Sequence, residues 1–160
     1  MIIKNYNRND AVAYAKKWAY LRNPKYYNFD KLGGDCTNFV SQCIYAGCKV
    51  MNYTKNTGWY YNSLNDRAPS WTGVEFLFNF LTQNKSIGPF GKQVLINELE
   101  IGDIIQLGKF NKNFYHTLIV TKIHNNNVYT SSHSIDSFDR PISSYNYQLI
   151  RCIHIQGFRK

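Results

Sequence analysis

The sequence is short of acidic residues. Its 160 residues include 10 Asp and Glu against 19 Lys and Arg, which gives a formal net charge of +9 at pH 7. No two of these acids stand in a context typical of the paired carboxylates of a glycoside hydrolase, so that class of enzyme is disfavoured. The positive charge favours an anionic partner such as an acidic wall polymer, a nucleic acid or a membrane surface, although no long basic run marks a dedicated binding face.

Long apolar runs are also absent. No run reaches the ~18 residues that a membrane-spanning helix needs. The start, "MIIKNYNRND", lacks the apolar segment of a signal peptide. We therefore expect no membrane span, and the sequence selects neither a compartment nor an oligomeric state.

The four cysteines form no metal-binding motif. No C-x2-C pair is present, which disfavours a structural zinc site. Cys36 and Cys43 would lie ~10.5 Å apart along one helix, beyond the ~7 Å limit for a disulfide. A phosphate-binding loop of the G-x-x-x-x-G-K type is missing as well. We therefore expect reduced cysteines, no metal and no cofactor.

Helical patterns come first along the chain and strand patterns later. Apolar residues at helical spacing predict helices over 8–21, from Cys36 to about Gly47, and over 73–82. Alternating or short apolar runs predict strands over 104–107, 115–123, 127–133 and 149–158. This order is typical of an α+β fold with an antiparallel sheet.

The stretch "GGDCTNFVSQ", residues 33–42, places Cys36 at the start of a predicted helix. Free N–H groups and the helix dipole favour a thiolate at that position. The preceding glycines allow a close approach of substrate to the backbone, whose N–H groups can hold an oxyanion. The pattern indicates a candidate nucleophile, whereas Cys43 looks like a packing residue.

A nucleophilic thiol needs a base, which is most often a histidine. His116 opens the apolar strand "HTLIV", and His133 ends the next strand of a predicted hairpin. With a two-residue turn at Asn125-Asn126, side-chain alternation puts both rings on one face of the sheet. A three-residue turn would put them on opposite faces, but Asn tolerates the positive φ of the tighter turn.

Four stretches carry a resemblance to a known family: "GGDCTNFVSQCIYAG", "LEIGDIIQL", "YHTLIVTKI" and "SSHSIDSFDRPISSY". They resemble the amidase-domain family of bacterial proteins, which is similar to the NlpC-type and CHAP cysteine peptidases of the papain-like superfamily. The resemblance covers nearly the whole chain. It implies one amidase-like cysteine hydrolase domain over residues 1–160, with a papain-like core in which the nucleophile's helix packs on an antiparallel sheet.

The resemblance also implies catalytic roles. Cys36 is the expected nucleophile, His116 the base and His133 the third residue that orients the base. Asp136 and Asp139 are alternative third residues. We expect the Cys36 sulfur to lie within ~4 Å of a His116 ring nitrogen.

Further residues are candidates for binding the substrate. The resemblance implies an oxyanion hole from the backbone near Cys36 and Asp35, with a hydroxyl from Tyr26 or Tyr27. Trp59 and Trp71 are candidates for lining a peptide or sugar groove, although core packing is the favoured interpretation of both.

Arg140-Pro141 is interpreted as a salt-bridged turn rather than as a substrate contact.

The resemblance implies hydrolysis of a peptide bond in bacterial peptidoglycan, at the cell wall or outside the cell. Two other interpretations stay open. A papain-like site can carry out acyl transfer or deamidation, and a basic, aromatic-rich domain can be a non-catalytic binder of wall polymer or nucleic acid. Nucleic acid is the less favoured of these partners.

Overall fold

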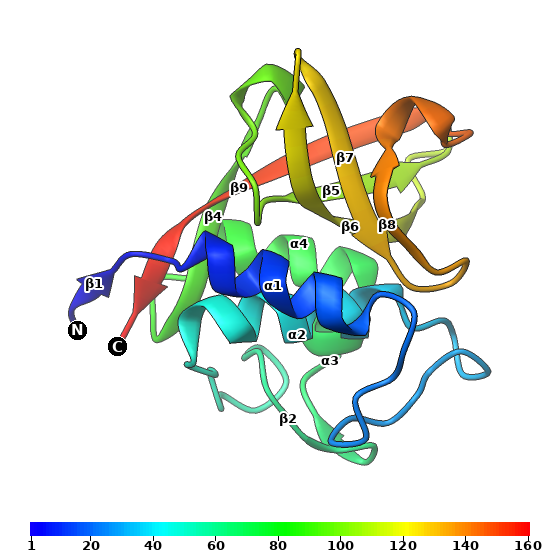
Figure 1. Ribbon diagram of the computed structural model, residues 1–160. Helices are drawn as coiled ribbons and strands as arrows, with labels where there is room; N and C mark the ends of the chain where they lie inside the picture. The colour runs from blue at the N-terminus through cyan, green and yellow to red at the C-terminus, as the bar shows by residue number, and fades with distance from the viewer.

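The computed structural model describes residues 1–160 and has a mixed α+β architecture (Figure 1). The three longer helices form a layer on one side of an antiparallel sheet, and irregular loops lie beyond them. The two ends of the chain lie side by side, where the Ile2 amide donates to the Lys160 carbonyl at 2.9 Å. The predicted class, α+β with an antiparallel sheet, is confirmed.

Helix bounds follow the sequence patterns closely. The α-helices are α1 (Arg8–Trp18), α2 (Cys36–Cys48), α3 (Pro69–Thr72) and α4 (Val74–Gln83), with 3-10 turns η1 (Ile96–Glu98) and η2 (Ile142–Ser144). The side chain of Asn7 caps α1 by accepting from the Asp10 amide at 3.0 Å. None of these helices combines the length and apolar character that crossing a membrane requires.

All four predicted strands are present, and the structure adds strands that the sequence did not reveal. The main sheet has the order β1-β9-β5-β6-β7-β8, with β4 also paired to β9, and β2 and β3 form a separate pair. The bounds are β1 (Ile3–Lys4), β2 (Tyr61–Ser63), β3 (Asp66–Arg67), β4 (Gly88–Val94), β5 (Ile104–Gly108), β6 (Phe114–His124), β7 (Asn127–Ser132), β8 (Ser137–Pro141) and β9 (Leu149–Arg159).

Both faces of the sheet are apolar. Ile119 on β6 points to the helices and belongs to the core that includes Phe39 and Ile44 of α2. Its neighbour Leu118 points to the other side and packs with Leu107 in a second core. Alternation along each strand therefore sends every second side chain to a different apolar layer.

A β-bulge interrupts the β6–β7 hairpin. The predicted two-residue turn at Asn125-Asn126 is confirmed, because both residues have positive φ and His124 pairs with Asn127. Thr121 is then an extra residue on β6, since the register shifts between Val120 and Lys122. One extra residue exchanges the two faces for everything beyond it.

A buried carboxylate fastens α1 to the sheet. Asp103, in the turn before β5, is fully buried and accepts hydrogen bonds from Arg8 Nη1 at 2.6 Å and from His154 Nδ1 at 2.8 Å. It also accepts from the backbone amides of Glu100 at 2.8 Å and Ile155 at 3.0 Å. Asp103 thereby joins α1, β5 and β9.

Replacing Asp103 by Asn should lower the free energy of unfolding by about 3 kcal/mol, because the partly buried Arg8 loses its buried counter-charge and at least one donor loses its acceptor. Urea denaturation followed by circular dichroism measures the change. Glu100→Gln is the matched control, since the Glu100 carboxylate lies 3.5 Å from the same Arg8 and is largely exposed. We expect a loss of at most about 1 kcal/mol for it, and an equal loss in both variants would contradict this role of Asp103.

Candidate active site

Cys36 is the first residue of α2, as the sequence predicts. The first bond of the helix runs from the Phe39 amide to the Asp35 carbonyl at 2.9 Å, while the Cys36 and Asn38 amides have no acceptor within the protein. Free N–H groups at a helix start favour negative charge nearby. The location therefore suits a thiolate or an oxyanion.

Cys36 and His116 line one cavity of about 450 Å³. The cavity lies at the end of the sheet where β5 and β7 end and β6 begins, and its wall also includes Leu107 of β5 and Arg140 of β8. Next to His116, the side chain of Thr117 meets that of Thr37 at 2.9 Å, which holds the first turn of α2 against β6. The structure thus brings the predicted nucleophile and base to the same cavity.

The Cys36 thiol and the His116 imidazole are both uncharged at pH 7. Burial raises the pKa of the Cys36 thiol, and the backbone N–H groups of Thr117 and Thr37 oppose that rise. Burial and the positive charge of Arg140 lower the pKa of His116 to about 4. No hydrogen bond joins the thiol to the His116 ring, and the sulfur lies 3.8 Å from Thr37 Oγ1 instead. A neutral imidazole at pH 7 can accept a proton from the thiol.

His133 lies on the other face of the sheet from His116. The bulge at Thr121 shifts the register so that Ile119 pairs with Ser131. Continued along β7, this register puts Ser132 opposite Leu118, whereas the expected same-face geometry needed His133 there. The expectation that the two histidine rings share a face is therefore wrong, and the extra residue is the reason.

Both ring nitrogens of His133 are used inside the protein. Nδ1 lies 2.5 Å from Asp35 Oδ2, and Nε2 lies 2.9 Å from the Trp18 carbonyl. A carbonyl only accepts, so Nε2 carries a hydrogen, and the His133–Asp35 pair holds a second proton between them. The ring also stacks on Phe39, with centroids 4.0 Å apart. His133 thus has no ring nitrogen free to orient His116.

Asp35 is the centre of this buried network. Its Oδ1 accepts from the Phe29 amide and from Asn38 Nδ2, each at 2.9 Å. Its Oδ2 lies 3.6 Å from Arg22 Nε as well as beside His133. The side chain joins the loop before α2, the first turn of α2 and the end of β7. Asp35 therefore fixes the position of Cys36, which follows it in the chain.

Asp136 and Asp139 also have partners other than His116. Asp136 receives two hydrogen bonds from Arg22, both at 2.9 Å. Asp139 accepts from Thr121 Oγ1 at 2.8 Å. Each acid that was an alternative third residue is thus engaged elsewhere.

The aromatic candidates lie away from the thiol. Neither Tyr26 nor Tyr27 lines the cavity of Cys36. Tyr26 stacks on Trp71 at 5.9 Å, and burial raises the pKa of its hydroxyl to about 12. Trp59 and Trp71 are fully buried in the helix-facing core. The groove interpretation of both tryptophans is therefore wrong, and the favoured packing interpretation is confirmed.

Arg140 was not expected at the site. The sequence favoured a salt-bridged turn, but Arg140 forms no ion pair, and its Nε and Nη2 donate to Ser144 Oγ and O at 2.8 and 3.1 Å. Its guanidinium lies 3.7 Å over the ring of Tyr145, within the wall of the cavity. The only signal in the sequence was its position in "FDRP", close to His133.

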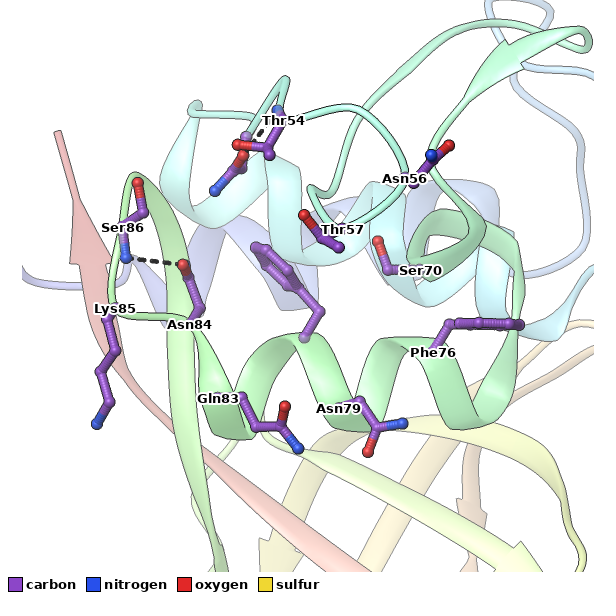
Figure 2. A pocket seen from close by; sticks show the side chains of 12 residues that line it. Thr54, Asn56, Thr57, Ser70, Phe76, Asn79, Gln83, Asn84, Lys85 and Ser86 are labelled. Atoms are coloured by element: carbon purple, nitrogen blue, oxygen red, sulfur yellow. Dashed lines mark hydrogen bonds between the residues drawn. The ribbon is translucent and has the colours of Figure 1, made fainter.

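A second cavity of about 470 Å³ lies between α4 and the loop at 52–57 (Figure 2). Phe76 stands at one end, and Lys85 and Ser86 stand at the other. The remaining side chains of its wall are carboxamides, hydroxyls and a second phenylalanine, with no Cys, His, Asp or Glu. This cavity therefore contains no cysteine and no histidine or carboxylate that could act as a base. No group of three or more His, Cys, Asp or Glu in the chain is placed to hold a metal ion.

Replacing His133 by Phe should keep the stack on Phe39 but leave the Asp35 carboxylate without one donor. We expect the free energy of unfolding to fall by about 3–5 kcal/mol, as for other broken buried charge pairs. Urea denaturation measures the loss, and His124→Phe, at an exposed position of the hairpin, should change stability by only about 0.5 kcal/mol. A loss below about 1 kcal/mol in His133→Phe would refute the structural role of the pair.

Comparisons with known proteins place the chain in a family. Residues 5–155 match the model of the family described as "Putative amidase domain". "Uncharacterized protein YhbB" of Bacillus subtilis (strain 168) is 32% identical over 139 residues, which covers 82% of this chain and 42% of that protein. "Uncharacterized protein YjcM" of the same strain is 27% identical over 148 residues, which covers 87% of this chain and 33% of that protein.

The chain thus spans less than half the length of these relatives. No solved structure matches it. The family match covers nearly all of the sequence, including the helix of Cys36 and the strand of His116. The chain therefore belongs to this amidase-domain family.

Proposed function

We propose that the protein is a thiol-dependent amidase with Cys36 as nucleophile and His116 as base. The observation that carries the proposal is that both side chains line one cavity, with Cys36 at a helix start whose N–H groups are free. A thiol, a neutral imidazole and unpaired backbone donors are the components that acyl transfer through a cysteine requires. Membership of an amidase-domain family agrees with this chemistry.

The reaction begins with proton transfer from the Cys36 thiol to His116 as the sulfur attacks the amide carbonyl carbon. The carbonyl oxygen becomes an oxyanion, which the Cys36 amide at the start of α2 can stabilise. His116 then gives the proton to the leaving nitrogen, and the C–N bond breaks to leave a thioester on Cys36. Water, deprotonated by His116, attacks the thioester and releases a carboxylic acid and the free thiol.

His133 supports this chemistry without touching the reacting atoms. Its bond to Asp35 holds the residue before Cys36, and Asp35 also holds Asn38 in the first turn of α2. We therefore assign His133 and Asp35 as positioning residues for the nucleophile.

The arrangement also fits a papain-like core, in which the nucleophile's helix packs on an antiparallel sheet that carries the base. α2 packs on β6 through Phe39 and Ile119 of the helix-facing core, and β6 carries His116. A peptide amide of the bacterial cell wall remains the proposed substrate, and the net charge of +9 suits an anionic wall polymer as a partner.

Replacing Cys36 by Ala should reduce amide hydrolysis by at least about 10³-fold, because the covalent intermediate cannot form. Incubation with purified peptidoglycan and a set of peptide amides, followed by mass spectrometry, measures turnover. Cys48→Ala, at a cysteine distant from the cavity, is the control and should remain active. Full activity of Cys36→Ala would eliminate the mechanism, and products joined to an added amine would point to acyl transfer instead.

The pH dependence of kcat/KM should show an acid limb centred near pH 4, the pKa to which burial and Arg140 lower His116. Below that pH the imidazole is protonated and cannot accept the thiol proton, so activity falls as the pH falls. Initial rates at low substrate concentration between pH 3 and pH 8 measure the limb, with folding checked by circular dichroism. A limb centred near 6.5, the ordinary value for histidine, would contradict this environment for His116.

A further inference from the structure

Arg140 is the one charged side chain in the wall of the cavity that holds Cys36 and His116. The ring of Tyr145 and the Ser144 oxygens fix the plane of its guanidinium. Nη1 makes no hydrogen bond within the protein. An arginine held in place with a free donor edge is suited to binding a planar anion such as a carboxylate.

No acid of the protein neutralises Arg140. The nearest acids in the sequence are Asp136 and Asp139, which accept from Arg22 and from Thr121. The wall of the cavity includes no carboxylate at all. The positive charge therefore faces the cavity without a counter-ion from the chain.

From these contacts we propose that the cavity contains a carboxylate subsite at Arg140, so that the preferred substrate carries a carboxylate close to the amide that Cys36 attacks. The description of the ligand as a substrate rests on the proposed function, whereas the subsite itself does not. Ile135, Tyr115 and Leu107 add apolar surface to the wall of the cavity, beside the polar side chains of Ser134 and Asn146. The ligand class is thus an acylated amino acid or short peptide with a free carboxylate and apolar flanking groups.

Alkylation of Cys36 tests the subsite without any hydrolysis. The thiolate displaces iodide from the CH₂ carbon of iodoacetate or iodoacetamide, forming an S–CH₂ bond and releasing iodide. The two reagents differ only in a carboxylate or a carboxamide. The rate with iodoacetate is divided by the rate with iodoacetamide, both measured by mass spectrometry of the Cys36 peptide. This ratio is then divided by the same ratio for 2-mercaptoethanol, and the result reports how strongly the cavity attracts the carboxylate.

Arg140→Gln should lower this normalised ratio by about tenfold or more, the value of one charge-assisted hydrogen bond. Any change in the ionisation of Cys36 alters the rates with both reagents equally and therefore cancels in their ratio. Arg140→Lys should retain part of the preference because it retains the charge. Lys109→Gln is the matched control, since Lys109 lies over Tyr115 outside the cavity wall, and it should change the ratio by less than about twofold.

Two results would overturn the subsite. One is an unchanged ratio in Arg140→Gln while Cys36 still reacts with iodoacetamide. The other is no reaction of Cys36 with either reagent even at a pH high enough to ionise the thiol, because a cavity that admits a carboxylate ligand beside the thiolate must admit iodoacetate. Circular dichroism of each variant confirms that the fold is intact.

Matched peptide amides then identify the source of the carboxylate. One pair ends in a free or an amidated carboxyl terminus, and a second pair carries Glu or Gln beside the scissile bond. The preferred acid should lose about tenfold in kcat/KM in Arg140→Gln, and its neutral partner should lose much less. Absence of all turnover with a retained iodoacetate preference would refute the amidase proposal alone, and turnover without any preference for an acid would refute the carboxylate subsite alone.

Discussion

The geometry around Cys36 depends on the buried carboxylate of Asp35. A carboxylate removed from water is stable only with donors or positive charge around it. Asp35 obtains them from the Phe29 amide, the Asn38 side chain and His133, with Arg22 close by. These donors come from the loop before α2, from α2 itself and from the end of β7, so one charge joins three parts of the chain. Because Cys36 directly follows Asp35 in the chain, the contacts of Asp35 also fix the position of Cys36.

The sheet separates two kinds of polar environment. On the helix side, His133 and Asp35 form a dry network in which every hydrogen bond is internal. Where β6 begins, His116 and Arg140 face an open cavity whose wall includes no acid of the protein. The first environment provides rigidity, and the second keeps an imidazole uncharged and a guanidinium available. Cys36, the proposed nucleophile, lies where the two environments meet, at the start of α2.

Much of this arrangement could be predicted from local patterns. The helix at Cys36, the hairpin turn at Asn125-Asn126 and the strand of His116 follow from periodicity and turn chemistry. Strands β4 and β8 could not be predicted, because "GPFGKQV" and "SFDRP" contain Gly, Pro or charged residues in place of alternating apolar residues. The bulge at Thr121 has no local signature, and its stabilising contact is with Asp139 on another strand. The positions of His133 and Arg140 could not be predicted either, because they too depend on contacts between segments that are distant in the sequence.

The bulge has an evolutionary consequence. Because side chains alternate with a period of two, an insertion or deletion of one residue within the strands between His116 and the end of β7 would bring both histidines to the same side of the sheet. Changes of two residues, or changes confined to the turn that leave the strands in register, would preserve both environments. Whether the number of residues in this hairpin is odd or even is therefore constrained more tightly than the identity of most residues within it. Among homologous chains, the residues of the β6–β7 hairpin should accordingly vary far more in identity than in number.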